Sequence, residues 1–448
     1  MTSTVRRASA FAAVGAISLA VPVIYQSFSR PVATVTAAAP FVAIAALALY
    51  VIEGGVVFEL FARPGDRRDG RLYGLAGFAL SIAGLSLLAT QFEMPVGVFV
   101  MSVCVLSFGN LASTAVRSRG VEPIGATTAF VAAAFLSGFG SHAAADRILG
   151  LPIDLPVLAF LAAAGALTAA LLRTVLFERD DPLVLLSVGL LLWLFADLAI
   201  DVTPQGIVIA FGITVALGYV SFALETASLP GMLTGVLLGL LTIVVGDVGW
   251  FAMLITFFGL GGLSSKFKYD RKVDRGIAQP NEGARGSGNV LANSLVALFA
   301  VIAHAAAPRI DAVPQDLFLF VFAGSVAAAM SDTFSSEIGG LYDRPRLITT
   351  LEVVDPGTDG GVTWQGALAG LLGAAIIAGI GVGMFEAIGT AGAAVVVAAG
   401  VVGMTVDSLL GALIEGRYVG NQGVNFLATL AAGLAGGGFA VALGLAPV

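Results

Sequence analysis

The stretch LFLFVFAGSVAAAM, residues 317–330, contains no charged side chain and runs directly into Ser331-Asp332-Thr333. A mostly apolar segment of about 20 residues is long enough to cross a bilayer as a helix. The segment 316–340 has this length, so it predicts a spanning helix that carries Asp332 and Glu337 toward one end. An ionisable side chain inside a span is costly, and it therefore indicates a functional site.

The composition of the whole chain agrees with a membrane protein. Of the 448 residues, 58% are hydrophobic and 11% are charged, and the mean hydropathy is +0.97. Soluble domains carry about 25% charged residues. The single cysteine, Cys104, excludes a disulfide scaffold, and the two histidines, His142 and His304, nearly exclude a Cys/His zinc site. A net charge of −7 argues against nucleic-acid binding.

Further segments of this kind predict an all-α polytopic membrane protein with about 15 transmembrane helices. They lie near 8–27, 36–60, 72–91, 95–116, 123–142, 155–176, 183–200, 205–226, 230–246, 248–264, 287–307, 316–340, 361–385, 390–412 and 424–445. Lys and Arg are retained on the cytoplasmic side of membranes. A cytoplasmic N-terminus and an external C-terminus place 19 of the 22 basic residues in inner loops, which favours this orientation in the cell membrane.

The two parts of the chain differ in character, which predicts two membrane modules. Residues 1–225 consist of hydrophobic segments with short loops, whereas residues 226–448 carry longer polar loops and most of the polar groups inside spans. All three lysines, Lys266, Lys268 and Lys272, fall within seven residues of one predicted inner loop. They are candidates for holding phosphate groups, or alternatively for anchoring the loop to anionic lipid.

Polar side chains occur at helical spacing in two later spans. Asn289 and Asn293 are four residues apart, so both amides lie on one helix face. They can contact a headgroup, a base or a metal-bound water, or they can hydrogen bond between helices. Asp332 and Ser336 share a face in the same way, whereas Glu337 points away from Asp332 on an ideal helix. A metal site shared by Asp332 and Glu337 therefore requires the helix to end or bend.

Carboxylates and hydroxyls suit Mg²⁺, a hard ion that prefers oxygen ligands and usually binds together with substrate phosphates. Asp407, near the inner end of the span 390–412, adds a third carboxylate to Asp332 and Glu337. The alternative for the Asp332 segment is a helix-packing motif with one stray charge.

A loop rich in glycine and threonine leads into the span 361–385. It contains Gly357, Thr358, Gly360 and Gly361. Exposed amides before a helix N-terminus attract anions, because these N–H groups are unpaired and the helix dipole favours negative charge. A flexible linker is the alternative interpretation.

In the predicted topology these groups reach the cytoplasmic face from different spans. Phosphoryl transfer depends mainly on positioning and charge neutralisation, which carboxylates, amides and a glycine-rich loop can supply. The sequence has no Walker A motif and no histidine at this face.

The stretch from about residue 229 to the C-terminus resembles the phytyl-phosphate kinase family, which includes transmembrane protein nineteen. The resemblance rests on segments that occur in order: 257–258 with 264–266, 288–293, 331–339, 345–350, 356–362 and 406–412. The family is related to CTP-dependent polyprenol kinases such as dolichol and phytol kinases. It implies an integral membrane kinase that converts an isoprenoid monophosphate to the diphosphate with a nucleoside triphosphate, CTP being the expected donor.

The first half contains a short segment with a related pattern. Phe108-Gly109-Asn110-Leu111-Ala112-Ser113 resembles the Gly-Asp-x-x-Ala-Ser element of dolichol kinases, with Asn110 in the place of the carboxylate. Residues 1–225 are therefore either a degenerate polyprenol-kinase-like half or a module that matches by coincidence.

These observations lead to one expectation with two rivals. Asp332, Glu337 and Asp407 are expected to bind Mg²⁺ in a kinase acting on an isoprenoid lipid phosphate within the membrane. Lys266, Lys268 and the loop with Gly357, Thr358, Gly360 and Gly361 are expected to hold phosphate oxygens, and Asn289 and Asn293 to orient the nucleotide or the metal-bound waters. The rivals are a secondary transporter, whose site lies near the bilayer midplane, and a cytidylyltransferase that forms a CDP-lipid.

Overall fold

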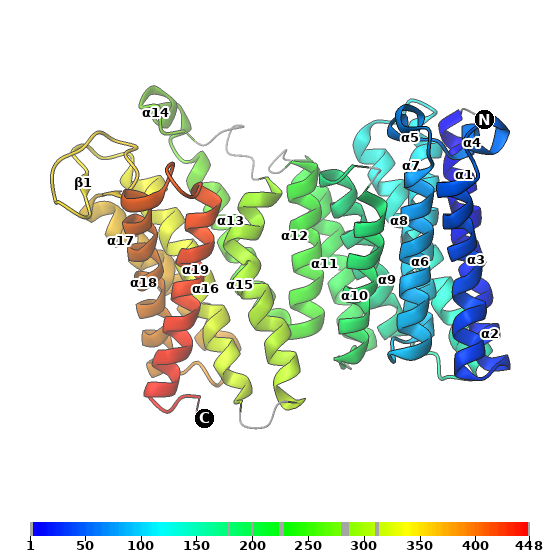
Figure 1. Cartoon of the computed structure of the whole chain (residues 1–448). Coiled ribbons are helices and arrows are strands. Elements are labelled where there is room, and N and C mark those ends of the chain that lie inside the picture. Colours follow the sequence, from blue (N-terminus) through cyan, green and yellow to red (C-terminus); the bar gives the residue numbers. More distant parts are fainter. Residues whose placement is uncertain are drawn as a thin grey trace. The chain divides into compact units, whose positions relative to one another are not determined.

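The computed structural model describes residues 3–177, 180–198, 200–223, 228–278, 286–309 and 313–446. Within these ranges, 14 helices are long and apolar enough to cross a membrane. The predicted class, an all-α polytopic membrane protein, is confirmed (Figure 1). The difference from the expected fifteen spans is at 183–200, where α10 (Asp181–Asp197) has only 17 residues.

The closely spaced pair of spans at 230–246 and 248–264 is confirmed, and a single residue separates them. α12 (Leu229–Leu241) continues through a π-helical turn (Thr242–Gly246), and α13 (Val248–Lys266) begins after Asp247. The Asp247 carboxylate accepts hydrogen bonds from the amides of Gly249 (2.6 Å) and Trp250 (3.3 Å). This N-cap satisfies amides that have no partner within the new helix, so the chain can reverse without a loop.

The chain forms two compact units, unit 1 (1–208) and unit 2 (209–448). The sequence-based boundary at 225/226 falls on residues outside the described ranges.

Unit 1 contains α1 (Ser3–Ala16), η1 (Ile17–Ala20), α2 (Val21–Ser27), α3 (Arg30–Tyr50), α4 (Gly55–Phe61), α5 (Pro64–Asp69), α6 (Tyr73–Gln91), α7 (Val96–Arg117), α8 (Pro123–Leu149), α9 (Leu155–Val175) and α10. Its centre is α7, which is buried from Val96 to Ser107 and packs against α1, α8, α9 and α10. α11 (Pro204–Ala223) begins in unit 1 and ends in unit 2.

Unit 2 is built around α16 (Gln315–Gly339), which contacts α13, α15, α17, α18 and α19. Its other elements are α12, α13, α14 (Tyr269–Asp274), α15 (Ser287–Ala306), η5 (Ala307–Arg309), β1 (Arg346–Leu347), β2 (Gly361–Val362), α17 (Trp364–Met384), α18 (Thr390–Ile414) and α19 (Asn421–Ala442).

Small residues allow the helices of unit 2 to approach α16 closely. A Cβ atom on Gly403 of α18 would lie 2.2 Å from the Cβ of Ala328, and one on Gly324 would lie 2.8 Å from the Ala432 carbonyl oxygen of α19. Lipid tails are as apolar as the side chains, so helices in membranes associate largely through such close packing. The polar end of α16 is thereby held against its neighbours.

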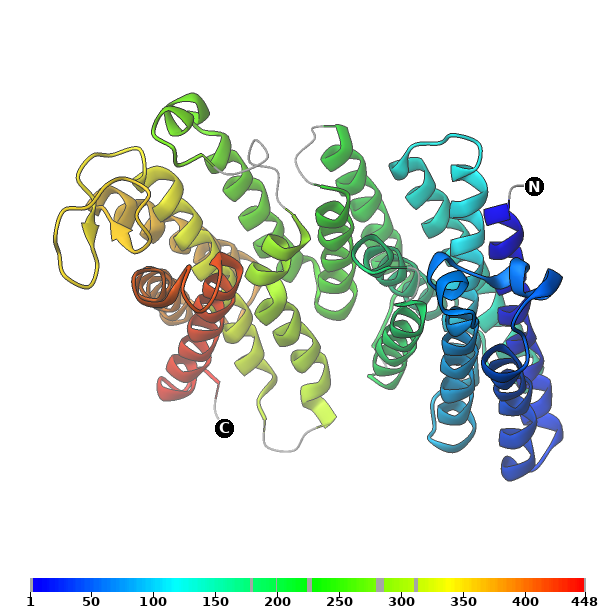
Figure 2. The same ribbon diagram turned by 45° about the horizontal axis from the view of Figure 1, so that its top comes forward.

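The helices of unit 2 alternate in direction, so their polar ends gather on one side. α13, α16 and α18 end where α15, α17 and α19 begin, and α14 and β1 lie at this same end (Figures 1 and 2). The two short strands pair antiparallel, with Arg346 opposite Val362 and Leu347 opposite Gly361. This hairpin ties together the connection between α16 and α17.

Candidate functional site

A cavity of about 960 Å³ opens at the polar end of unit 2. Residues from α13, α14, α15, α16, α18 and α19 and from the α16–α17 connection line it. Segments from Ser265 to Asn425 therefore meet at one place.

The structure brings nine of the eleven predicted site residues to this cavity. They are Asn289, Asn293, Asp332, Glu337, Gly357, Thr358, Gly360, Gly361 and Asp407. The other two, Lys266 and Lys268, are exposed at the end of α13 and do not line it. Lys272 of α14 lies there in their place, because the turn at Phe267 and Lys268 directs the following helix back toward α16.

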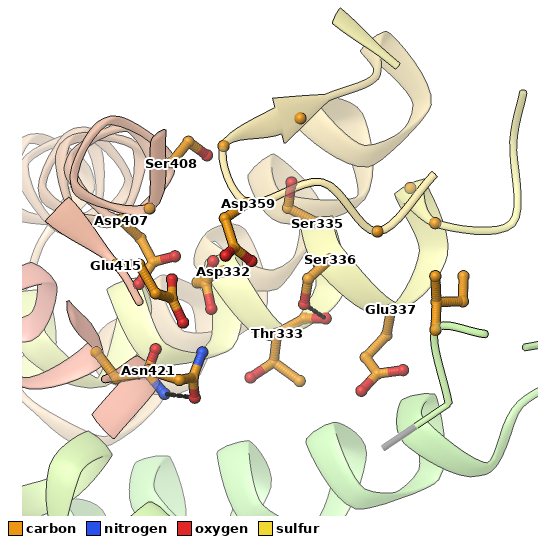
Figure 3. Close-up of a pocket in the computed structure, with 18 of the residues that line it drawn as sticks. Asp332, Thr333, Ser335, Ser336, Glu337, Asp359, Asp407, Ser408, Glu415 and Asn421 are labelled. Atoms are coloured by element: carbon orange, nitrogen blue, oxygen red, sulfur yellow. Dashed lines mark hydrogen bonds between the residues drawn. The ribbon is translucent and has the colours of Figure 1, made fainter. Parts of the chain in front are cut away.

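Four carboxyl groups lie on one side of the cavity: Asp332, Asp359, Asp407 and Glu415 (Figure 3). Asp332 and Asp407 come from different helices and are within hydrogen-bonding distance of each other. Two ionised carboxylates this close repel each other, so the pair requires a shared proton or a bound cation. The Oδ1 atom of Asp407 is buried and has no hydrogen-bond partner, which leaves it available to a ligand.

Glu337 lies apart from this group and has partners of its own (Figure 3). Its Oε2 accepts a hydrogen bond from Lys272 Nζ at 2.6 Å, and its Oε1 accepts one from Ser265 Oγ at 3.0 Å. Lys272, only 1% exposed, also donates to the carbonyl oxygens of Ser264 (2.7 Å) and Ser265 (3.2 Å). α16 is continuous to Gly339, so the bend required for Asp332 and Glu337 to share a metal ion is absent.

Glu415 follows the last residue of α18 and lies outside the predicted spans. Burial raises the pKa of its carboxyl group, and the nearby charge of Asp359 raises this pKa further. A hydrogen bond from Asn421 opposes the shift by favouring the ionised form. The acidic side of the cavity is therefore crowded enough to favour protonation or cation binding.

Three helix N-termini point their unpaired amides toward the same end. The N-cap residues of α15, α17 and α19 are Gly286, Thr363 and Gly420, and all three line the cavity. Thr363 caps α17 through its hydroxyl, which accepts from the Gly366 amide at 3.1 Å. The positive ends of three helix dipoles favour an anion in the cavity.

The glycine-rich loop before α17 is held rigidly against α18. The amide of Thr358 donates to Asp355 (3.2 Å), and that of Gly361 donates to Thr358 (2.9 Å). Gly360 has φ +76°, and a Cβ atom on it would lie 2.5 Å from the Cβ of Ala412 and 2.7 Å from the Ser408 carbonyl oxygen. In the described part of the chain, the amides of Gly357, Asp359 and Gly360 have no hydrogen-bond acceptor. The loop thus offers donors to an anion.

Two asparagine pairs face the cavity, and the sequence analysis considered only one of them. Asn293 Nδ2 donates to the Asn289 carbonyl oxygen at 2.9 Å, while Asn425 Nδ2 lies 3.4 Å from Asn421 Oδ1. Both pairs line the cavity, on α15 and α19. The signal that could have identified the second pair is the repeated pattern Gly-Asn-x-x-x-Asn, at 288–293 and at 420–425.

The donor chemistry of the cavity suits a hard cation. Within the described ranges, no three carboxyl, imidazole or thiol groups are arranged as ligands of one metal ion. Mg²⁺ usually needs only one or two protein carboxylates, since waters and substrate phosphates complete its shell. Asp332 and Asp407, with the unpartnered Oδ1 atom of Asp407, fit this requirement.

Comparison with known proteins assigns the part of the chain that holds this cavity to a family. Residues 212–433, all within unit 2, match the integral membrane proteins designated DUF92, and the chain belongs to this family. The uncharacterised membrane protein MJ0933 of Methanocaldococcus jannaschii is 38% identical over 214 residues, which cover 46% of this chain and 82% of that protein.

Two further relatives have similar coverage of this chain. The chloroplastic protein VTE6 of Arabidopsis thaliana is 31% identical over 206 residues, covering 45% of this chain and 61% of that protein. The uncharacterised membrane protein sll0875 of Synechocystis is 30% identical over 211 residues, covering 45% of this chain and 77% of that protein. No solved structure matches the chain.

Proposed function

We propose that the protein is an isoprenoid monophosphate kinase, which transfers the γ-phosphoryl group of a nucleoside triphosphate to a lipid monophosphate. CTP is the expected donor, in keeping with the resemblance of the motifs to phytyl-phosphate kinases. The observation that carries the proposal is the contact between Asp332 and Asp407, in a cavity that also contains the free amides of the 357–360 loop.

The charge of the cavity is the first argument for a metal-dependent reaction. Five carboxyl side chains line it: Asp332, Glu337, Asp359, Asp407 and Glu415. Lys272 is the cation among the described lining residues, and it is paired with Glu337. A triphosphate alone would be repelled by this surface. Mg²⁺ held by Asp332 and Asp407 would neutralise phosphate charge, and Glu337 is left to position α14 through Lys272.

Donors for the phosphate groups lie in the glycine-rich loop that also carries Asp359. The free amides of Gly357, Asp359 and Gly360 can bind phosphate oxygens, and the hydroxyl of Thr358 lies in the same loop. The N-termini of α15, α17 and α19 add a favourable potential. Asn289 and Asn293, together with Asn421 and Asn425, are assigned to the nucleoside, because amide groups can both donate and accept hydrogen bonds.

The reaction needs little acid–base chemistry. An oxygen of the lipid phosphate attacks the γ-phosphorus, the bond from this phosphorus to the β–γ bridging oxygen breaks, and the nucleoside diphosphate leaves. A phosphate monoester has a second pKa near 6, so it is largely ionised at neutral pH and requires no general base. This agrees with a cavity that contains no histidine among its described lining residues.

The lipid is expected to enter sideways from the cytoplasmic leaflet. Several basic residues lie at the cavity end of unit 2, among them Lys266, Lys268, Arg271, Arg275 and Arg344. Basic residues of membrane proteins concentrate on the cytoplasmic side. Lys266 and Lys268, which are exposed, are assigned to lipid headgroups at the entrance.

The test is a transfer assay with purified full-length protein, Mg²⁺, geranylgeranyl phosphate and γ-labelled CTP or ATP. A kinase moves the label into a lipid diphosphate and releases the nucleoside diphosphate. A cytidylyltransferase releases pyrophosphate and incorporates label from the α-position of CTP instead. Absence of both products over a panel of nucleotides and isoprenoid phosphates would contradict the proposal and favour transport.

A further inference from the structure

The short helix α14 is held against the end of α16 by side chains at and just beyond its C-terminal end. Lys272 pairs with Glu337, and Arg275 donates to the backbone carbonyl oxygens of residues 341 and 342, at 3.3 and 3.1 Å. Ile277, which follows the end of the helix, adds an apolar contact. A helix of six residues has little stability of its own, so these contacts decide where it lies.

α14 ends in a Schellman motif, which fixes the direction of Ile277. The amide of Ile277 donates to the carbonyl oxygen of Lys272 at 3.0 Å, and that of Gly276 donates to the carbonyl oxygen of Val273 at 2.9 Å. Gly276 has φ +70°, the left-handed conformation that this motif requires. Ile277 is the residue after this glycine, and it lines the cavity.

The side chain of Ile277 packs between glycines of two different segments. A Cβ atom on Gly340, the C-cap residue of α16, would lie 2.8 Å from Ile277 Cδ1, and one on Gly357 would lie 2.7 Å from Ile277 Cγ2. The isoleucine therefore touches both backbones. Gly357 begins the 357–360 loop, and Gly360 at the other end of this loop rests on α18. The loop is thus held from both sides.

We propose that Ile277 is a positioning residue for phosphate binding, which fixes the 357–360 loop relative to α16 and so keeps the free amides of the loop in place. The inference rests on the proposed function, because that function supplies the phosphate. Donors that are ordered before binding add affinity, since no free energy is then spent on ordering them. Ile277 has no polar group, so it acts through the loop and not on the phosphate itself.

The inference also gives a role to the buried pair of Lys272 and Glu337. Lys272 is only 1% exposed, and its carbonyl oxygen accepts the hydrogen bond from the Ile277 amide. A buried ion pair adds little net stability, because the loss of hydration offsets the attraction between the charges. The pair can instead fix a position, since Glu337 holds α14 and α14 carries Ile277 to the loop.

The first measurement is amide hydrogen exchange of the full-length protein in detergent, without nucleotide. The amides of Thr358 and Gly361 donate to carbonyl oxygens within the loop segment, so their exchange reports its order. Ile277→Ala should speed this exchange about tenfold, because the loop loses apolar packing at Gly357. Ile277→Val keeps the Cγ2 atom that meets Gly357 and should restore most of the protection.

Val273→Ala is the matched control on the same helix. Val273 is also β-branched, but it is 52% exposed and does not line the cavity, so its truncation should leave exchange in the loop unchanged. Ile277 is half-buried, and Ile277→Ala is therefore expected to fold.

The second measurement is the nucleotide KM in the transfer assay. Misplaced amides weaken binding in the ground state and in the transition state alike, so Ile277→Ala should raise KM and leave kcat nearly unchanged. The expected rise is about tenfold, the size of one hydrogen bond to a charged group. A loss of folded protein would instead lower the apparent kcat and leave KM unchanged.

The two measurements separate this inference from the proposed function. Unchanged exchange in Ile277→Ala overturns the inference, whether or not the protein is a kinase. Equal acceleration in Val273→Ala overturns it as well, because the effect would then belong to α14 in general. Faster exchange with an unchanged KM removes Ile277 from phosphate binding. Faster exchange in a protein that transfers no label contradicts the kinase alone and supports the positioning of the loop by Ile277.

Discussion

The cavity of unit 2 and a smaller pocket of unit 1, of about 330 Å³, present opposite charges to a ligand. The first has five carboxyl groups and one lysine among its described lining residues, while the second has four arginines and one aspartate. The acidic cavity can accept a phosphate only together with a cation, as the proposed kinase requires, whereas two of the arginines of unit 1 are engaged by Asp181.

In the proposed kinase, a metal ion between carboxylates and phosphate would neutralise charge that develops during transfer, and it could leave with the product. Each region also contains a buried ion pair, Lys272 with Glu337 in unit 2 and Arg63 with Asp181 in unit 1, which fixes the local helices.

The largest effect is expected from Asp332→Asn in the acidic cavity. The substitution removes one charge of the pair with Asp407, and lipid diphosphate formation should fall about 10³-fold, as for loss of a main electrostatic group in an active site. Asp343→Asn is the control, because Asp343 is exposed and outside the cavity. Full activity of folded Asp332→Asn would remove Asp332 from the mechanism.

Lys272→Met should destabilise the protein by about 3–5 kcal/mol, because it leaves Glu337 charged and buried without its partner. Thermal unfolding in detergent measures the loss. Lys266→Met, at an exposed lysine outside the cavity, should have little effect. The double variant Lys272→Met with Glu337→Gln should recover part of the stability. If it is no more stable than Lys272→Met, the ion pair does not explain the loss.

Removal of Mg²⁺ tests the role of the acidic cavity directly. With EDTA, nucleotide binding to the full-length protein is expected to weaken about 100-fold, because the carboxylates then repel the triphosphate. Binding curves with Mg²⁺ and with EDTA, measured in one preparation, test this expectation. Equal affinity under the two conditions would contradict a metal-dependent site.

Gly360→Ala should reduce transfer about tenfold. The residue has φ +76°, and a new Cβ would meet Ala412 and the Ser408 backbone, so the loop must move away from α18. Gly416→Ala is the matched control, since Gly416 has φ +70° but nothing within 4 Å of the added atom. Both variants should lose about 1 kcal/mol of stability from backbone strain. Only Gly360→Ala should lose activity.

The smallest effect concerns Glu415, whose pKa is raised by burial and by the charge of Asp359. A raised carboxyl pKa favours the protonated form in the folded state. The contribution to stability is complete below the unfolded pKa, near 4.5, and is lost as pH rises through the higher folded value. Glu415→Gln should therefore gain about 1 °C in Tm relative to the parent between pH 4 and pH 8. Glu352→Gln, at an exposed position outside the cavity, is the matched control.

Local sequence predicted the fold class well because each spanning helix is encoded by its own apolar residues. Even the single-residue separation at Asp247 was visible, since a charged residue between two apolar runs is a strong local signal. The predicted and observed numbers of spanning helices differ at α10, which has 17 residues. The exact ends of a helix are hard to predict from its own sequence, because they depend on neighbouring elements.

The sequence predicted the site less well where the course of the chain decides which side chain faces the cavity. The lysine cluster was evident, but the turn after α13 leaves Lys266 and Lys268 exposed and buries Lys272. Asp359 lies in the predicted glycine-rich loop, but its carboxyl group was not predicted as part of the site. Glu415 and Asn421 join the cavity although nothing in their immediate sequence was taken as a signal. The pocket of unit 1 was likewise not predicted, because its arginines, Arg7, Arg63, Arg117 and Arg173, come from four separate segments of the chain.

The sequence by itself determined that the chain crosses a membrane many times and that it carries acidic, amide and glycine-rich segments at the ends of its helices. These properties follow from hydropathy and spacing, which are local. Tertiary structure decided which carboxylates meet, that Glu337 pairs with Lys272 while Asp332 contacts Asp407, and that Arg63 and Arg173 share Asp181. Such pairings depend on how helices distant in the chain pack, which no single stretch of residues encodes.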